Sequence, residues 1–276
     1  MQRLDMDPED GGASGSPRTS DRPPVGEPLV VSRHRPPDPE PEAEQPVPVP
    51  TGPLSGRTGL VTGATGELGA AFAGALAERG ARVVLVDADL AGLRRTSSHL
   101  PGSDPALILR CDLGSADDVE AACDFLRRSG AHLDLVVHAA SVDESLPVIA
   151  GPVESLDEQY LISVRAPSLL SRHLSDSMAP GASVVFVDRD PGDGGHDVRS
   201  QRTVLAAARQ GLVDVLRAEL GSGDIRLLAA SCGESSAASD VADVVLDVAV
   251  RGGSAKVTAL RVEDGTVIAD PALPGA

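Results

Sequence analysis

Short apolar runs alternate with longer amphipathic segments along this chain from about residue 55 onward. The apolar runs have the length of strands and lack the polar alternation of a strand with one solvated face, so they predict strands that are buried on both faces. The predicted strands are Gly59–Thr62, Arg82–Asp87, Leu107–Cys111, Leu133–His138, Ser183–Val187, Ile225–Ala230 and Val257–Val262. The segments between them that predict helices are Glu67–Arg79, Ala116–Arg128, Asp157–Met178, Gln201–Leu220 and Asp240–Val250.

This alternation predicts an α/β fold, namely a single Rossmann-type domain with a doubly wound parallel sheet of about seven strands. Ligands of such sheets bind at the carboxyl ends of the strands. The residues that follow each strand are therefore the first candidates for a functional site.

The first 54 residues differ in composition from the rest. They hold 13 of the 22 prolines and contain no aromatic residue. Such a segment buries too little apolar surface to offset its chain entropy. We therefore expect a disordered proline-rich acidic tail (1–54), a Rossmann-type domain (55–264) and a short C-terminal tail (265–276). The N-terminal tail is either a solvated segment or a docking segment for a protein partner.

Charge and composition narrow the function classes. The 276 residues carry a formal net charge of -17. Such a chain repels phosphate backbones and anionic lipids, which argues against binding to nucleic acid or a membrane surface. The sequence has no apolar run of the roughly 18 residues that a membrane span needs and no apolar segment of the kind found in a secretory signal. Cys111, Cys123 and Cys232 are too widely spaced to suggest a disulfide framework or a metal site, so a reduced, cytoplasmic setting is expected.

A glycine-rich turn, TGATGELG, joins the first predicted strand to the first helix. Gly63 permits a tight turn, Gly66 lets a pyrophosphate approach the backbone at the helix N-terminus, and Gly69 lets the helix pack close to the sheet. The second strand ends in Asp87. A carboxylate there accepts hydrogen bonds from adenosine-ribose hydroxyls and repels a 2′-phosphate, so the pattern favours NAD over NADP. A tight turn with a helix-capping Asp is the alternative.

In these residues the chain resembles the short-chain dehydrogenase/reductase (SDR) family, from about Arg57 to Val262. The resemblance implies that Asp112 and Leu113 lie against the adenine and that the segment 138–140 lies beside the ribose. The predicted cofactor-binding residues are Gly63, Thr65, Gly66, Glu67, Leu68, Gly69, Asp87, Asp112, Leu113, His138, Ala139 and Ala140. The glycine spacing is similar to the extended branch of the family, since the compact branch has a glycine where this chain has Glu67. The length is similar to the compact branch, so the subfamily stays open.

The catalytic residues of this family are substituted here. The family uses a Tyr as general acid and base, a Lys four residues later, a Ser that positions the carbonyl and an Asn that supports a proton relay. The only Tyr of this chain is Tyr160 and its only Lys is Lys256, so the Tyr-x-x-x-Lys pair occurs nowhere. Matching the helix 201–220 to the family puts Arg202 at the Tyr position and Ala206 at the Lys position.

The other two positions of the family's catalytic set also differ. Arg189, or Asp188 with a shifted register, falls at the Ser position, and Ser163 falls at the Asn position. An Arg stays protonated and cannot exchange protons near neutral pH, but its charge can stabilise a developing oxyanion. His196, in the loop 188–199, is a candidate proton carrier in place of the Tyr.

Three functions follow from this combination. The first is an SDR-like protein that binds NAD(P) but serves as a non-redox regulatory, scaffolding or accessory subunit. The second is an atypical NAD(P)-dependent oxidoreductase acting on a small carbonyl or alcohol, which would use Arg202, Arg189 or His196. The third is an SDR-derived lyase, isomerase or cyclase. Enzyme activity therefore stays open. A homodimer or homotetramer, built on the helices 157–178 and 201–220, is implied by the resemblance alone.

Overall fold

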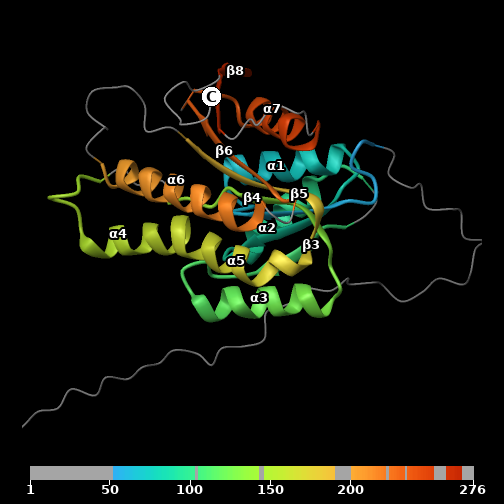
Figure 1. The fold of residues 1–276 in the computed structure, drawn as a ribbon, viewed down its shortest axis with the longest axis horizontal. Coiled ribbons are helices and arrows are strands. Elements are labelled where there is room, and N and C mark those ends of the chain that lie inside the picture. The colour runs from blue at the N-terminus through green and yellow to red at the C-terminus, as the bar shows by residue number, and fades with distance from the viewer. Residues whose placement is uncertain are drawn as a thin grey trace, which may run out of the picture.

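The computed structural model describes residues 52–102, 105–142, 146–189, 200–221, 224–233, 235–251 and 259–268 (Figure 1). The strands are β1 (Thr58–Thr62), β2 (Arg82–Asp87), β3 (Leu107–Arg110), β4 (Leu133–His138), β5 (Met178–Arg189), β6 (Arg226–Cys232), β7 (Ala259–Glu263) and β8 (Thr266–Ile268). The α-helices are α1 (Glu67–Glu78), α2 (Leu90–His99), α3 (Ala116–Arg128), α4 (Val153–Tyr160), α5 (Ala166–Leu174), α6 (Gln201–Leu220) and α7 (Ala238–Arg251).

All the strands belong to one 8-stranded sheet with the order β3-β2-β1-β4-β5-β6-β7-β8. Strands β1 to β7 run parallel, and β8 pairs antiparallel with β7. The chain extends the sheet from β1 to β3 on one side and then returns to place β4 on the other side of β1. The strand order therefore reverses between β1 and β4, which is where ligands of doubly wound sheets bind. The predicted fold class is confirmed.

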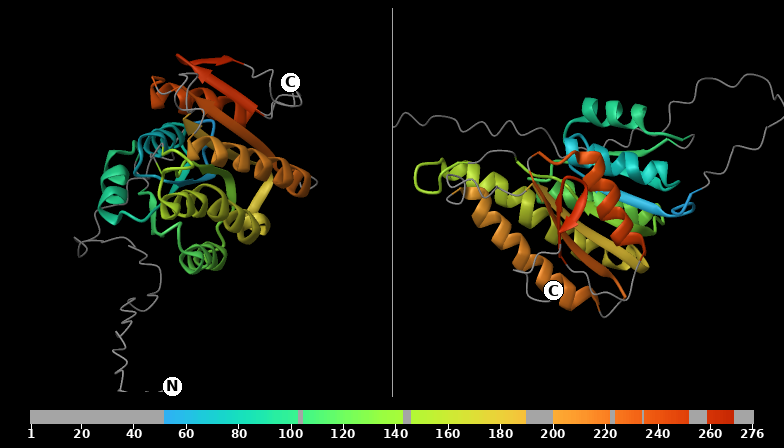
Figure 2. Two further views of the ribbon diagram at one scale, coloured as in Figure 1. Left: turned by 90° about the vertical axis from the view of Figure 1, so that its left-hand side faces the viewer. Right: turned by 90° about the horizontal axis from the view of Figure 1, so that it is seen from above.

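Helices cover both faces of the sheet, which explains why its central strands are apolar at nearly every position. α1 and α7 pack against each other and against one face, and α3, α5 and α6 cover the other face. In Figure 1, α1 and α7 lie toward the top and α3 and α5 toward the bottom, with strands between them. The two perpendicular views of Figure 2 also show α6 running beside α4.

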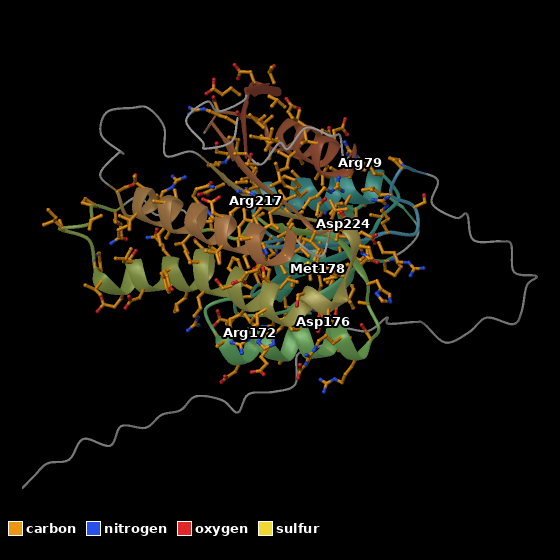
Figure 3. All side chains as sticks on the ribbon, in the orientation of Figure 1. Arg79, Arg172, Asp176, Met178, Arg217 and Asp224 are labelled. Atoms are coloured by element: carbon orange, nitrogen blue, oxygen red, sulfur yellow. The ribbon has the colours of Figure 1, made fainter. Side chains whose placement is uncertain are left out.

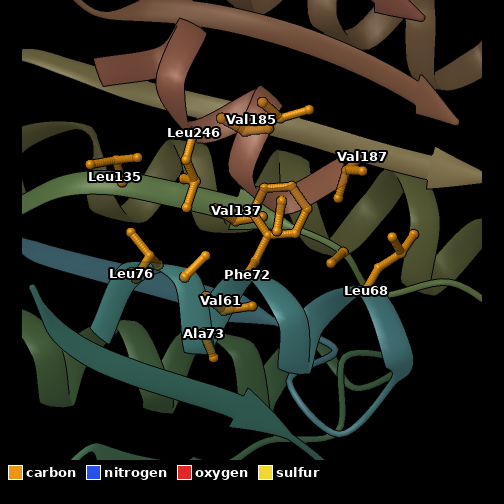
Figure 4. Close-up of a cluster of buried hydrophobic side chains, with 14 of the residues drawn as sticks. Val61, Leu68, Phe72, Ala73, Leu76, Leu135, Val137, Val185, Val187 and Leu246 are labelled. Carbon is orange, nitrogen blue, oxygen red and sulfur yellow. The ribbon is translucent and has the colours of Figure 1, made fainter. Parts of the chain in front are cut away.

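The core on the α1 side is centred on Phe72 (Figure 4). Its ring is fully buried and is surrounded by aliphatic side chains of α1, α7 and the central strands, among them Val137 and Leu246. The chain has only three Phe and no Trp, so branched aliphatic residues fill most of the space between sheet and helices. Burial of the Phe72 side chain contributes about 1.5–3 kcal/mol to stability.

The segment 157–178, predicted as one helix, is divided in the structure. α4 is followed by a π-helical turn, η1 (Leu161–Arg165), then by α5 and by a short 3-10 turn, η2 (Ser175–Ser177). Pro167 lies in the first turn of α5. Because a proline has no N–H, it cannot donate to the carbonyl of Ser163 four residues earlier, and the wider π turn accommodates this gap.

Two elements were not predicted. α2 buries only Gly92 and Leu93, so its sequence has the pattern of a surface segment. β8 spans three residues and lies beyond residue 264, which means that the sheet extends into the predicted C-terminal tail.

Packing also extends into the predicted N-terminal tail, at Leu54. Its side chain is fully buried, and its backbone N–H donates to the Arg79 carbonyl oxygen at 2.9 Å. Arg79, labelled in Figure 3, makes ion pairs with Asp243 and Asp247 of α7 at 2.8 and 3.2 Å. Residues 1–51 and 269–276 lie outside the described residues.

Candidate functional site

The glycine turn after β1 brings two strand ends into close contact. Gly63 has a φ of +67°, in the left-handed region that favours glycine. A Cβ on Gly63 would lie 2.5 Å from the Cα of Ala140, in the segment that follows β4. A Cβ on Gly69 would overlap the carbonyl oxygen of Gly63. Gly69 thus lets the start of α1 approach the backbone of the turn that directly follows β1.

Gly66 is the N-cap residue of α1 and has extended backbone angles that any residue adopts. It provides no side chain to cap the helix, so the first-turn amides of α1 remain available to an anion.

Asp87, at the end of β2, is hydrogen-bonded to the glycine turn. Its Oδ2 accepts from the backbone N–H of Thr65 at 3.2 Å and from the Thr65 hydroxyl at 2.7 Å. Its Oδ1 accepts from the backbone N–H of Asp89 at 3.1 Å. A carboxylate has about four acceptor positions, so three are used and about one remains. Asp87 therefore retains about one acceptor position for a ribose hydroxyl.

A cavity of about 350 Å³ lies at the carboxyl ends of these strands, within the range of about 300–1,000 Å³ that is usual for small-molecule sites. The predicted cofactor residues that line it are Gly63, Thr65, Gly66, Glu67, Leu68, Asp87, Asp112, Leu113, Ala139 and Ala140. Ala88, Cys111, Ser141 and Ile162 line it as well. All four were missed, although Ala88, Cys111 and Ser141 are each adjacent in sequence to a predicted residue at a strand end, and Ile162 precedes Ser163.

Two arginines also line this cavity. Arg189 ends β5, and its guanidinium Nη1 donates to the carbonyl oxygens of Gly233 and Ser236, both at 3.2 Å. Arg202 lies in the first turn of α6, and its Nη2 donates to the Arg189 carbonyl oxygen at 3.0 Å. These residues are 13 positions apart in the sequence, and the fold brings both guanidinium groups to the same site.

The start of α6 is fixed by a buried polar contact. Gln201, which is 1% exposed, accepts a hydrogen bond on Oε1 from the Gln159 amide of α4 at 3.0 Å. Farther along α6, Arg209 pairs with Asp188 of β5. These two contacts hold the helix against α4 and β5 and so determine where Arg202 lies.

An ion pair connects the glycine turn to the arginines. The Arg189 Nη2 and the Glu67 Oε2 are 2.8 Å apart. Sequence reasoning missed this pair, because the two residues are 122 positions apart and only the sheet order brings them together. The cavity is thus bordered by the carboxylates of Glu67, Asp87 and Asp112 and by two guanidinium groups.

Several predicted site residues lie outside the cavity lining. His138 is buried and does not line the cavity, although Ala139 and Ala140 do, and its ring lies 4.8 Å from that of Phe186. Ser163 is buried in the π turn η1, and Ala206 lies one turn beyond Arg202 on α6. His138 points away because alternate residues of a strand face opposite sides of the sheet.

The single tyrosine of the chain is also placed away from the cavity. Tyr160 lies at the end of α4 and is 47% exposed, and it does not line the cavity. Lys256 and His196 lie outside the described residues.

Burial suppresses the ionisation of two groups next to the cavity. Desolvation, followed by the charge of Asp118, raises the pKa of Cys111 to about 12, so this thiol is a poor nucleophile near neutral pH. Desolvation lowers the pKa of His138 to about 3, and neither ring nitrogen has a hydrogen-bond partner among the described residues. His138 is therefore neutral and cannot act as an imidazolium acid.

The residues of the cavity fit the adenosine diphosphate part of a dinucleotide. The turn at Gly63 has no room for a Cβ, the N-terminus of α1 is not capped by a side chain, and Asp87 retains about one acceptor position. Within the described ranges, no group of three or more His, Cys, Asp or Glu residues is arranged to hold a metal ion. None of the described helices is long and apolar enough to cross a lipid bilayer.

Residues 63–245 match the family model described as enoyl-(acyl carrier protein) reductase. Among curated proteins, the chain is 29% identical over 180 residues to D-threitol dehydrogenase from Mycolicibacterium smegmatis, covering 63% of this chain and 68% of that protein. It is 30% identical over 129 residues to sorbitol dehydrogenase from Cereibacter sphaeroides, covering 46% and 49% of the two chains. Several other curated relatives are matched over less than half of their own length.

Among solved structures, the chain is similar to a metagenomic short-chain oxidoreductase crystallised with NADP. The identity is 25% and the TM-score is 0.68, and the match covers 76% of this chain and 98% of that one. The similarity therefore spans about three quarters of this chain and nearly all of the other chain.

Proposed function

We propose that this chain, which belongs to the short-chain dehydrogenase/reductase family, binds an NAD-type dinucleotide and is an atypical oxidoreductase acting on a small alcohol or carbonyl compound. The observation that carries the proposal is the cavity itself, in which a glycine turn, a strand-end carboxylate and two arginines meet. Two of the curated relatives are named as dehydrogenases of polyols, and they favour this function over the non-redox interpretation that the sequence placed first.

The nucleotide would lie with its diphosphate at the N-terminus of α1 and its adenosine ribose beside Asp87. NADH is expected to bind more tightly than NADPH, because the Asp87 carboxylate repels a 2′-phosphate. Arg110, which is paired in register with Asp87 at the end of β3, acts in the opposite direction, because its positive charge attracts a 2′-phosphate. Comparing the affinities of NADH and NADPH for the same preparation shows which of the two charges dominates.

The chemistry at the other end would rely on charge in place of a proton-donating side chain. When bound, a reduced nicotinamide supplies a hydride to the substrate's carbonyl carbon. The guanidinium group of Arg202 stabilises the negative charge that develops on the carbonyl oxygen. Because this group stays protonated, the proton that completes the alcohol comes from water. Loss of general acid catalysis costs about 10²- to 10⁴-fold in rate, so turnover will be slow.

The test combines calorimetric titration of the full chain with NADH and NADPH and a turnover assay. The assay follows the absorbance of reduced nicotinamide with a panel of polyols and ketoses that includes D-threitol and sorbitol. We expect turnover that is lost in Arg202→Gln while nucleotide binding is retained. If neither NADH nor NADPH bound to the chain, the proposal would be refuted.

A second candidate is the non-redox dinucleotide-binding subunit, and one observation favours it. Tyr160, the only tyrosine, lies on α4 outside the cavity, so the family's acid and base is missing from the lining. Tight NADH binding without turnover on any panel member would select this candidate.

A further inference from the structure

The ion pair between Glu67 and Arg189 extends from one wall of the cavity to another. Glu67 is the first residue of α1, directly after the glycine turn, and Arg189 is the last residue of β5. Both line the cavity, and their charged groups are 2.8 Å apart. A ligand that extends from the glycine turn toward Arg202 therefore meets this pair.

The two partners are held very differently. The Arg189 side chain is 16% exposed, and its Nη1 is anchored by the carbonyl oxygens of Gly233 and Ser236. The Glu67 side chain is 70% exposed. An ion pair with such an exposed partner contributes little stability, so Glu67 is the partner that can turn away while Arg189 stays in place.

Glu67 also occupies the position that an anionic ligand would prefer. The first turn of a helix attracts negative charge through its amides and dipole, and Glu67 is the acidic residue of that turn in α1. Arginine binds phosphate oxygens bidentately, in the same way as it binds a carboxylate. A diphosphate at the glycine turn would therefore compete with Glu67 for both the N-terminus of α1 and the guanidinium of Arg189.

We propose that Glu67 is a specificity-determining residue, an internal anion that weakens the binding of diphosphate-bearing nucleotides, and that Arg189 is the diphosphate ligand which it masks. The inference rests on the proposed function, because it assumes that the cavity binds an adenine nucleotide. It adds that affinity depends on displacing one named carboxylate. A ligand without phosphate, such as adenosine, has no such competitor.

The experiment compares three proteins, all as the full chain: the natural sequence, Glu67→Gln and Glu78→Gln. Glu78 is exposed at the far end of α1, so its substitution removes the same charge from the same helix. Calorimetric titration with NADH, ADP and adenosine gives the affinities. We expect Glu67→Gln to bind NADH and ADP about two- to fivefold more tightly, with adenosine changed less than about twofold. Glu78→Gln should match the natural sequence.

Arg189→Met, alone and combined with Glu67→Gln, completes a double-mutant cycle. If Arg189 is the masked ligand, the gain from Glu67→Gln disappears in the Arg189→Met background. Thermal melting checks that each protein is folded, and if Arg189→Met is not, the three-ligand comparison decides alone.

Unchanged NADH affinity in Glu67→Gln would overturn this inference while the proposed function stands. An equal gain for adenosine and ADP would also overturn it, because a general loosening of the turn would then explain the result. No binding of any ligand to any of the proteins would overturn both.

Discussion

His138 provides a direct test of the packing under the cavity. It lies at the end of β4, is 4% exposed, and packs its ring against Phe186. Neither ring nitrogen has a partner among the described residues. Burial of an imidazole without hydrogen bonds penalises its charged form, and this desolvation lowers the pKa of His138 from 6.5 to about 3.

The sign and the size of the effect on stability follow from linkage. Below pH 6.5 the unfolded chain binds a proton at this imidazole while the folded chain does not, so stability falls as the pH falls from about 6.5 to about 3. Each pH unit in this window costs about 1.4 kcal/mol. Between pH 7 and pH 5, His138 alone should reduce the free energy of unfolding by about 2 kcal/mol.

The assay is urea denaturation at a series of pH values, for the natural sequence and for His138→Leu. If leucine packs less well, the variant is less stable at every pH. Between pH 7 and pH 5, however, its free energy of unfolding should fall by about 2 kcal/mol less than that of the natural sequence. His132→Gln is the control, because His132 is exposed in the turn before β4. Parallel curves for His138→Leu and the natural sequence would refute the reasoning, since they would mean that His138 takes up a proton in the folded state.

Two further predictions concern the glycine turn and the thiols. Gly63→Ala should reduce the free energy of unfolding by about 2–4 kcal/mol and abolish nucleotide binding, because it combines left-handed strain with a clash against Ala140. Gly74→Ala within α1 has open space around the new methyl and should stabilise by about 0.5–1 kcal/mol; chemical denaturation measures both, and equal stability of the two variants would contradict the argument. Cys111 and Cys123, whose pKa values burial raises to about 12, should react with Ellman's reagent at pH 8 only after denaturation, because about 10⁻⁴ of each is thiolate at that pH. Rapid labelling of the folded chain would show that these thiols are accessible.

The parts of the fold that follow from local pattern were predictable. β2 and β4 match their predicted bounds, because each is an apolar run buried on both faces with a polar residue to mark its end. β5 begins at Met178, earlier than predicted, since Pro180 and Gly181 look like loop residues although Met178 already pairs with Leu133. The π turn could not be predicted either, since it depends on how the backbone accommodates Pro167.

The candidate site was likewise predictable only where its residues are close together in the sequence. The glycine turn and Asp87 were found because a strand, a turn and a helix N-terminus are contiguous in the sequence. The pairing of Glu67 with Arg189 was not, because it depends on the placement of β5 next to β4 and on the side-chain directions at both ends. The orientation of the His138 side chain could not be predicted either, because the resemblance identified its position on the strand but not the side of the sheet that its ring faces.

The outer strands of the sheet have a consequence for self-association. In the described part of the chain, β3 at one edge has four residues and β8 at the other has three. Short edge strands present few unpaired backbone groups, so they are poor templates for strand addition by another molecule. If copies of this chain associate, we expect contact through helical surfaces such as α4 and α6, where Tyr160, Val204 and Val215 are about half exposed. The sheet would then remain closed to the edge-to-edge growth that leads to fibrils.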